Sequence, residues 1–313
     1  MAEMVNKATR QSFGEAVTAI AKENPDIIVL DADLAAATMT GIFQKEFPER
    51  FIDCGIAECN MIGIAAGLST CGKIPFAASF AMFSAGRAFE QVRNSVGYPH
   101  LNVKVVGSHA GISVGEDGAS HQCCEDIALM RTIPGMVILN PADHYEMQAA
   151  VKAAAAYQGP VYIRLGRLPV ESFNNGDDYK FELGKGITLV DGNDITVVAT
   201  GLMVSRALQA VQSLKEQGIH ARLINIHTIK PLDEEIILKA ARETGKIVTV
   251  EEHNVIGGLG EAVSSVLCAH HPVPVRKIGV NDTFGHSGPA VQLLDEFGLN
   301  AENIEKTVKD MLK

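Results

Sequence analysis

The sequence predicts an α/β protein of two domains, each built on a parallel β-sheet. Short runs rich in β-branched residues alternate with helical patterns along the 313-residue chain, and this alternation is typical of parallel strands joined by crossover helices. A polar stretch at residues 172–186 interrupts the alternation once, so we expect a linker there. Because 47% of the residues are hydrophobic and only 20% are charged, the chain can form sizeable cores and is not generally disordered.

The first expected domain covers residues 1–171. Its predicted strands are short apolar runs of the length that buried parallel strands have, and they lie at residues 27–31, 74–79, 103–107, 136–139 and 161–165. Between them apolar residues recur at helical spacing, which predicts helices at residues 10–23, 60–69, 85–96, 125–132 and 142–155. This order predicts an open sheet with helices packed on it.

The second expected domain, residues 187–313, repeats the alternation on a smaller scale. Its predicted strands lie at residues 195–199, 221–226, 247–251 and 276–279. Its predicted helices lie at residues 204–217, 233–244 and 261–269, followed by two short helices of which the last covers residues 301–312. The same periodicity argument therefore predicts a second parallel sheet.

Charge and composition exclude several classes of protein. With 27 Lys and Arg against 37 Asp and Glu, the formal net charge is −10, which argues against nucleic acid as the main partner. Glu3, Lys7 and Arg10 interrupt the first segment, so we expect no export signal and a cytoplasmic protein. The longest uncharged segments are rich in Gly, Ser and Thr, and we expect no membrane span. The six cysteines have neither zinc-site nor disulfide-framework spacing.

One long stretch is almost uncharged and opens with a carboxylate. Between Cys59 and Gly86 the single charged residue is Lys73, whereas an exposed surface of that length normally carries several charges. This predicts either a helix and strand buried in their own domain or a large subunit interface. Glu58 begins the stretch, and it is either a helix-start residue favoured by the macrodipole or a functional carboxylate in an apolar site.

A glycine-rich loop carries the second group of candidates. Residues 107–122 follow a predicted strand, hold four glycines, and include His109, Glu116, Asp117 and His121. In open α/β sheets ligands bind at the carboxyl ends of the strands. We therefore interpret this loop as functional.

Other chemistries find little support in the sequence. Ser108–His109 and Ser120–His121 are neighbours in sequence, whereas the Ser–His pair of a hydrolase converges from different segments, so we expect no hydrolase. No two histidines have metal-binding helical spacing, so we expect no metal ligand from this chain. The run G-G-L-G-E at residues 257–261 could receive an anion at a helix start, although a plain strand-to-helix turn explains it better. We expect His227, His253 and His286 to be core or turn residues.

Several motifs taken together resemble those of transketolases in order and spacing. They are A-T-R-Q-S at residues 8–12, D-A-D-L at 31–34, G-I-A-E-C-N-M at 55–61, S-F-A-M-F at 79–83, G-E-D-G-A-S-H-Q at 115–122 and D-T-F-G-H-S-G-P at 282–289. The resemblance covers almost the whole chain. It implies a pyrimidine-binding thiamine-diphosphate fold, then a transketolase C-terminal domain, and transfer of a two-carbon ketol unit from a ketose to an aldose.

The family's other half has no counterpart in this sequence. That half carries the G-D-G…N motif for thiamine diphosphate and Mg²⁺. The resemblance therefore implies the C-terminal subunit of a split transketolase, with an N-terminal subunit as the partner that holds the diphosphate and Mg²⁺. Because the family's cofactor lies between domains of different protomers, we expect two copies of each chain.

The resemblance also implies roles at the cofactor. Glu58 matches the family's glutamate that hydrogen-bonds N1′ of the aminopyrimidine and helps to remove the C2 proton. Phe80 and Phe83 match the aromatic residues that pack on the pyrimidine ring. Asp33 matches a position near the thiazolium across the subunit interface.

Further matches concern the sugar substrate. His109, Asp117 and His121 match residues of the sugar channel. There the histidines, whose pKa is ordinarily near neutrality, would shuttle protons, and Asp117 would accept a hydrogen bond from a donor hydroxyl. Arg10 and Arg167 match the arginines that bind the terminal phosphate. Arg164, at the end of a predicted strand, either assists this binding or faces solvent.

The departures from the family pattern concern the substrate. Ala35, Ala36 and Ala37 replace a polar run, Cys59 replaces a glutamine, and Gly86 replaces an aromatic residue. A non-phosphorylated or otherwise modified ketose is therefore an alternative donor. Two other functions stay open: the β subunit of a 2-oxo acid dehydrogenase first component, and a non-catalytic binding or regulatory subunit. We expect the second domain to supply interfaces and stability rather than chemistry.

Overall fold

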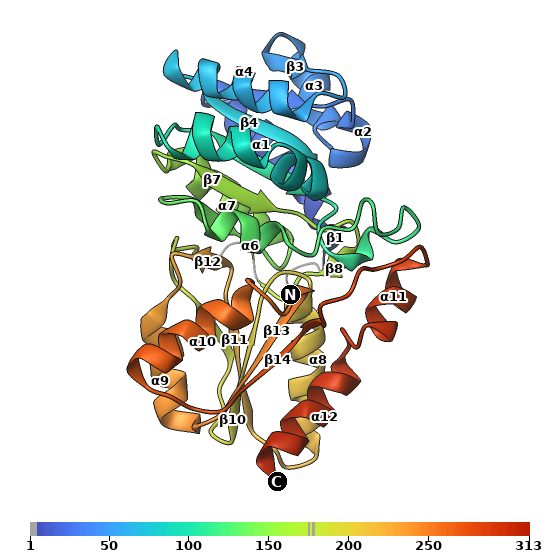
Figure 1. Ribbon diagram of the computed structural model, residues 1–313, viewed down its shortest axis with the longest axis vertical. Coiled ribbons are helices and arrows are strands. Elements are labelled where there is room, and N and C mark those ends of the chain that lie inside the picture. Colours follow the sequence, from blue (N-terminus) through green and yellow to red (C-terminus); the bar gives the residue numbers. More distant parts are fainter. Residues whose placement is uncertain (1–4, 175, 177–178) are drawn as a thin grey trace.

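The structure, a computed structural model, describes residues 5–174, 176 and 179–313. Two large sheets lie one above the other in Figure 1, each flanked by helices, and the polypeptide passes from one to the other after residue 171. Most strand pairs in both sheets are parallel. This confirms the predicted α/β class. Asn175, Asp177 and Asp178 of the expected linker lie outside the described residues.

The first sheet has seven strands in the order β12-β6-β7-β5-β4-β2-β3. All pairs are parallel except β12 with β6. The strands are β2 (Ile27–Asp31), β3 (Phe51–Asp53), β4 (Ile74–Phe80), β5 (Lys104–Ser108), β6 (Val137–Leu139), β7 (Val161–Arg164) and β12 (Thr228–Lys230). The five predicted strands are present. The edge strands β3 and β12 were not predicted, and β12 comes from the part of the sequence that we assigned to the second domain.

Helices cover both faces of this sheet because successive strand residues point to opposite sides. On β2, Val29 packs with one cluster of buried side chains and Leu30 packs with another. The cluster around Val29 includes residues of α1 (Thr9–Ala21), α3 (Gly41–Glu46) and α7 (His144–Ala156). The cluster around Leu30 includes residues of α4 (Glu58–Thr70) and α6 (Asp126–Arg131). Two further helices are short, α2 (Ala35–Thr38) and α5 (Phe89–Gln91).

The helix predicted at residues 85–96 is not a regular α-helix. It consists of π-helical turns at Met82–Arg87 and Val92–Gly97 on either side of α5. Both π-helical turns contain a tightly packed glycine: a Cβ atom on Gly86 would lie 2.3 Å from Met82 Cε, and one on Gly97 would lie 2.5 Å from Ile133 Cγ2. Such π-helical turns are frequent at functional sites.

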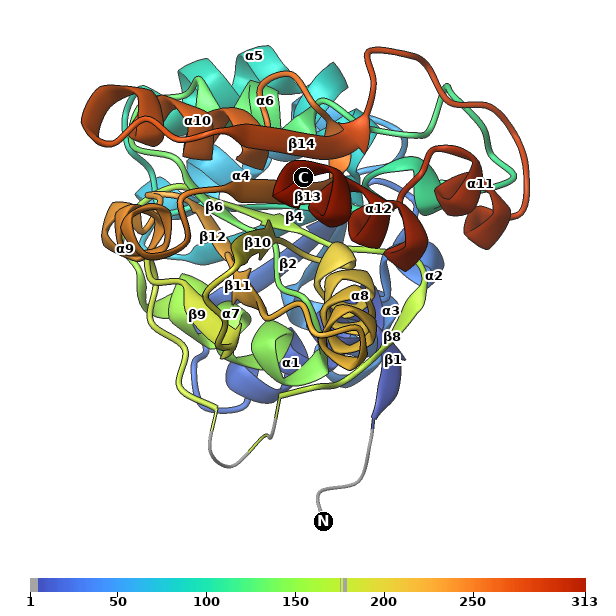
Figure 2. The same cartoon turned by 90° about the horizontal axis from the view of Figure 1, so that it is seen from below.

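The second sheet has five strands in the order β14-β13-β10-β11-β9. Its strands are β9 (Ile187–Val190), β10 (Ile195–Ala199), β11 (Ala221–Asn225), β13 (Ile247–Asn254) and β14 (Val275–Val280). Its helices are α8 (Met203–Glu216), α9 (Glu234–Thr244), α10 (Leu259–His270), α11 (Ala290–Glu296) and α12 (Ala301–Leu312). Figure 2 shows α9 and α10 on the left and α8 and α12 on the right. The predicted strands and helices are present, and the antiparallel edge strand β9 was not foreseen.

The two halves of the structure share buried apolar contacts. Ile127 of α6 lies in the same cluster as Leu259 and Val263 of α10. A small antiparallel pair of β1 (Asn6–Ala8) and β8 (Pro169–Glu171) lies beside the junction. The carboxyl ends of β4, β5 and β7 are at one edge of the first sheet, as parallel pairing requires. No helix in the described part of the chain is long and apolar enough to cross a membrane.

Candidate active site

Four of the predicted site residues form a cluster of rings. Phe80 ends β4 and His109 follows β5, and their ring centroids are 4.0 Å apart in a stacked arrangement. Phe83 stacks with Phe80 at 6.0 Å, and the His121 ring meets Phe83 edge-on at 5.3 Å. Adjacent parallel strands bring these residues together, although they are distant in sequence. The structure thus brings these four predicted residues together.

His109 differs from the prediction in its protonation. Its side chain is buried, its backbone has φ +56°, and its Nδ1 lies 2.9 Å from Ser108 Oγ. Burial, followed by the charges of Arg10 and Arg167, lowers the pKa of His109 to about 3. The sequence analysis assumed titration near neutrality, so the structure corrects it: the imidazole is neutral at physiological pH because an imidazolium there would be desolvated beside two cations.

Glu58 is the first residue of α4 and is only 2% exposed. Its two carboxylate oxygens lie 3.1 and 3.0 Å from Nη1 of Arg87. The guanidinium of Arg87 also lies over the Phe83 ring, 4.5 Å from its centroid. The sequence analysis missed Arg87, yet the signal was present, because Arg87 is the first charged residue after the uncharged stretch that Glu58 opens.

Arg10 lies close to His109, and the charge of Arg167 also acts on this imidazole. Arg10 Nη1 donates to Ala37 O at 2.7 Å and lies 3.5 Å from His109 Nε2, and its buried Nε has no hydrogen-bond partner. Arg167 contacts Glu116 Oε2 at 2.9 Å. Burial and the nearby charge of Arg167 lower the pKa of Arg10. An unpartnered donor between neighbouring cations fits an anionic ligand.

Three other residues have different surroundings. Asp117 is exposed on the loop at residues 109–122, which we call the substrate loop. Asp33 is also exposed. Its backbone N–H donates a hydrogen bond to Asp53 Oδ1 at 3.1 Å. Arg164 does not face solvent, because its side chain is buried and its Nε donates to the buried Asp126 carboxylate at 2.7 Å.

A groove of about 810 Å³ lies next to the ring cluster. Phe83, Arg87 and Gln122 line it from the first domain. Asp282 and Phe284, which follow β14, line it from the second. The Phe284 side chain is 89% exposed. The D-T-F-G-H-S-G-P motif therefore lies beside the candidate site, although we assigned the second domain no part in it.

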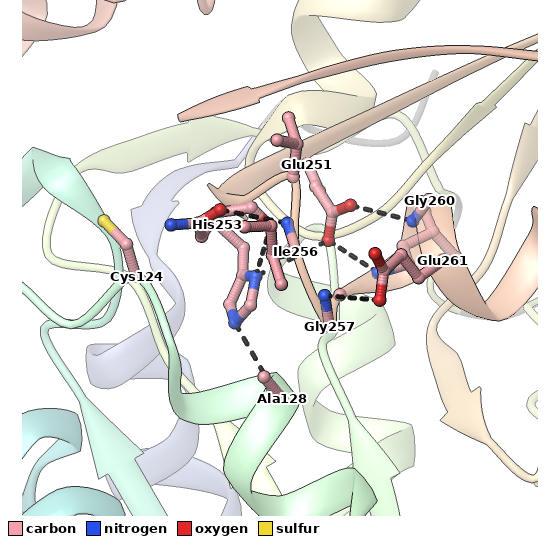
Figure 3. Close-up of polar contacts among 12 residues, drawn as sticks. Cys124, Ala128, Glu251, His253, Ile256, Gly257, Gly260 and Glu261 are labelled. Atoms are coloured by element: carbon pink, nitrogen blue, oxygen red, sulfur yellow. Dashed lines mark hydrogen bonds and ion pairs between the residues drawn. The ribbon is translucent and has the colours of Figure 1, made fainter. Parts of the chain in front are cut away.

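The backbone N–H groups at the start of α10 already bind a side-chain carboxylate of this chain. The Glu251 carboxylate accepts hydrogen bonds from the backbone of Leu259 at 2.6 Å and Gly260 at 2.8 Å (Figure 3). Nearby, Nε2 of the buried His253 accepts from Ala128 N at 3.3 Å, and its Nδ1 lies 2.7 Å from Asn254 O. The G-G-L-G-E run is thus a strand-to-helix turn capped from within, and His253 is a structural residue, as expected.

Two family models match the chain. The model of the transketolase pyrimidine binding domain matches residues 6–171, and that of the transketolase C-terminal domain matches residues 184–304. A solved structure described as a split gene transketolase, inactive beta4 tetramer, superposes with a TM-score of 0.91 at 51% identity and covers 98% of both chains.

Whole-length relatives agree with these matches. A chain of Methanocaldococcus jannaschii described as a transketolase C-terminal section is 51% identical and covers 99% of this chain and 98% of its own. The 6-deoxy-6-sulfo-D-fructose transketolase subunit of Clostridium sp. is 44% identical, with 96% and 94% covered. An apulose-4-phosphate transketolase subunit of Phocaeicola vulgatus is 42% identical, with 98% of both covered. The chain belongs to the transketolase family.

Proposed function

We propose that this chain is the C-terminal subunit of a two-chain, thiamine-diphosphate-dependent transketolase that moves a two-carbon ketol unit from a ketose to an aldose. The observation that carries the proposal is the buried Glu58 carboxylate, which is paired with Arg87 over the Phe83 ring, together with the cluster of rings that Phe83 forms with Phe80, His109 and His121. Arg10 lies beside His109 of this cluster. The full-length similarity to proteins described as transketolase subunits supports it.

The residues present fit the aminopyrimidine end of the cofactor. Thiamine diphosphate, when bound, supplies the nucleophilic carbon and the electron sink for ketol transfer. Glu58 would hold a proton at N1′ of the pyrimidine, a task that suits a carboxylate shielded from water. Phe80 and Phe83 would provide a flat apolar surface for the ring. Asp33, exposed beyond β2, would lie near the thiazolium at the subunit interface.

The substrate would lie along the substrate loop. A neutral His109 whose Nδ1 faces Ser108 would present Nε2 as a hydrogen-bond acceptor to a sugar hydroxyl, and His121 would act from the other side of the rings. Asp117, which is exposed on this loop, would accept a hydrogen bond from a hydroxyl of the donor sugar and so select the stereochemistry of that sugar.

We assign an anionic end group to the donor sugar. Arg10 and Arg167 present a cationic pair with an unpartnered buried donor, Arg10 Nε. Two relatives are described as acting on a sulfonated or a phosphorylated ketose, and both end groups are anions that arginine binds through paired hydrogen bonds. Ala37 contributes its carbonyl to Arg10 and has no hydroxyl, which leaves the anion with one fewer donor than in the family pattern. We therefore propose a phosphate- or sulfonate-terminated ketose.

The diphosphate and Mg²⁺ would be bound mainly by an N-terminal partner subunit. The described residues contain no group of three or more His, Cys, Asp or Glu side chains placed to hold a metal ion. We propose a complex with two copies of each chain, in which the exposed face of α4 next to Glu58 meets another subunit. Gly63 and Gly67 are exposed on that helix, and a Cβ on either would meet no atom within 4 Å.

The experiment compares the wild-type complex with Glu58→Ala. Both chains are co-purified with a transketolase N-terminal subunit and given thiamine diphosphate, Mg²⁺, a ketose donor and ribose 5-phosphate. We expect at least a roughly 100-fold lower turnover in the variant, because the proton at N1′ loses its partner. The exposed Glu90→Gln, on the segment that follows Arg87, is the matched control. Equal turnover in wild type and Glu58→Ala would instead indicate a non-catalytic subunit.

A further inference from the structure

The substrate loop begins in the first domain, but its middle is inserted into the second. Ile112 is fully buried within the hydrophobic cluster formed by strands and helices of the second sheet. The loop is also closed on itself, because Gly111 N donates to Cys123 O at 2.8 Å and Gln122 Nε2 donates to Ile112 O at 3.1 Å. Gln122 Nε2 further donates to the backbone oxygen of His286, at 3.0 Å.

Glu252 of β13 is the charged residue of the second domain that touches this insertion. Its Oε1 accepts a hydrogen bond from the backbone N–H of Ser113 at 2.7 Å, and the residue is only 3% exposed. Gly111 packs directly on the same carboxylate, since a Cβ there would lie 2.3 Å from Oε1. Gly111 also has φ +83°, a conformation that favours glycine.

The backbone of Glu252 is fixed from the first domain. Arg164 Nη2 donates to Glu252 O at 2.8 Å, and the same guanidinium is held by Asp126 at 2.7 and 3.2 Å. These groups are buried, so the position of Glu252 relative to β7 is tightly determined. The Glu252 carboxylate therefore links the backbone of the substrate loop to a residue whose own position is fixed by Arg164.

His109 lies two residues before Gly111. Its backbone has φ +56°, and its ring is stacked on Phe80. A left-handed backbone in a non-glycine residue persists only where the surroundings determine it. Because the chain runs from His109 straight into the residues that Glu252 holds, a shift of Gly111 or Ser113 would move the imidazole.

We propose that Glu252 is a positioning residue, whose hydrogen bond to Ser113 N sets the substrate loop and thereby the place of the His109 ring. The second domain then takes part in catalysis without touching the substrate. This inference rests on the proposed function, because it assumes that His109 acts on the sugar. A 1 Å error in such a ring costs about 100-fold in rate.

The test uses the complex with the N-terminal subunit and three variants of this chain. Glu252→Ala removes the acceptor, whereas Glu252→Gln keeps an oxygen that Ser113 N can reach. Arg131→Met is the matched control, because Arg131 Nη1 donates to Gly258 O at 2.9 Å across the same junction but does not contact the substrate loop. For each we would measure kcat and KM for the donor, thermal stability, and amide hydrogen exchange of residues 109–122.

For Glu252→Ala we expect kcat/KM to fall about 10- to 100-fold and the amides of the substrate loop to exchange faster. Glu252→Gln should restore both to near wild type, and Arg131→Met should lower thermal stability alone. If Glu252→Ala and Arg131→Met lose stability equally and neither changes kcat/KM or loop exchange, the positioning role is wrong. A wild-type complex that transfers no ketol unit would refute the proposed function and the catalytic part of this inference, while the exchange data would still decide whether Glu252 fixes the loop.

Discussion

At the scale of single residues, the ion pair of Glu58 with Arg87 gives the site its main electrostatic feature. The Arg87 guanidinium is planar, bonds the Glu58 carboxylate and stacks on Phe83. An aminopyrimidine placed as we propose would need the same carboxylate and the same ring. Arg87 is half exposed and lines the adjacent groove, so it has room to move aside.

We therefore predict that Arg87→Met strengthens binding of thiamine diphosphate by the assembled complex. The expected decrease in Kd is about 3- to 10-fold, since a pair with one half-exposed partner contributes roughly 1 kcal/mol. Isothermal titration calorimetry at two salt concentrations would measure it. Arg93→Met is the control, because Arg93 is exposed further along the same segment. Weaker binding by Arg87→Met would show that Arg87 supports the cofactor rather than competing with it.

The sequence indicated which residues are candidates for the site, but it did not indicate their protonation or their ion-pair partners. The resemblance assigned Phe80 and Phe83 to the cofactor and His109 and His121 to the sugar, and the structure places the four rings close together. The pKa of His109 could not be predicted in this way, because its decrease comes from burial and from arginines that are distant in sequence. The partner of Glu58 was missed for the same reason, since a π-helical turn brings Arg87 back to it.

At the scale of elements, helix α4 presents an unusual exposed face. Most of its residues are apolar or small, yet Asn60, Gly63 and Gly67 are exposed. The two glycines are four residues apart. Residues four apart lie on the same side of a helix. Small side chains on one face let another helix approach closely, and Glu58 begins this same helix.

We predict that Gly63→Arg prevents assembly with the N-terminal subunit while the chain itself stays folded. An arginine at this position has open space in the isolated chain, but a subunit packed on α4 would bury its charge. Analytical ultracentrifugation should show affinity reduced by at least about 100-fold. Gln212→Arg, at an exposed position of α8, is the control. Normal assembly of Gly63→Arg would place the interface elsewhere.

Element prediction was most successful where apolar periodicity was strong. The strand at residues 27–31 agrees with β2 residue for residue, and the last helix agrees with α12. The edge strands β3, β9 and β12 were missed because they are short and only partly buried, whereas the equally short β6 and β7 are completely buried and so read as apolar runs. The π-helical turns were missed because their residues are ordinary helix formers except for the two glycines.

At the scale of the whole molecule, a buried carboxylate joins the two domains. Glu146 of α7 accepts hydrogen bonds from Asn225 of β11 at 2.8 Å and from the backbone of Ala142 at 2.6 Å. The hydroxyl of Tyr179, which precedes β9, also donates to it. Burial raises the pKa of Glu146 to about 7. The folded protein therefore binds a proton at this group that the unfolded chain, with an ordinary pKa, releases at lower pH.

This raised pKa predicts a pH dependence of stability. The contribution of Glu146 is fully present below about pH 4.5 and is lost as the pH rises through about 7, a total of about 3 kcal/mol in the free energy of unfolding. Denaturant unfolding between pH 4.5 and 8 should therefore show a smaller decrease with pH in Glu146→Gln than in wild type. Glu216→Gln, at an exposed position, should behave as wild type. The same pH slope in all three chains would contradict this account of Glu146.

The central claim is that this chain holds one half of a ketol-transfer site and needs a partner for the other half. The most direct measurement is product formation from xylulose 5-phosphate and ribose 5-phosphate, with thiamine diphosphate and Mg²⁺, by this chain alone, by an N-terminal transketolase subunit alone, and by the mixture. We predict sedoheptulose 7-phosphate from the mixture only, and its loss when Glu58→Ala replaces the wild-type chain. Equal turnover by the Glu58→Ala mixture, or by the N-terminal subunit without this chain, would contradict the claim.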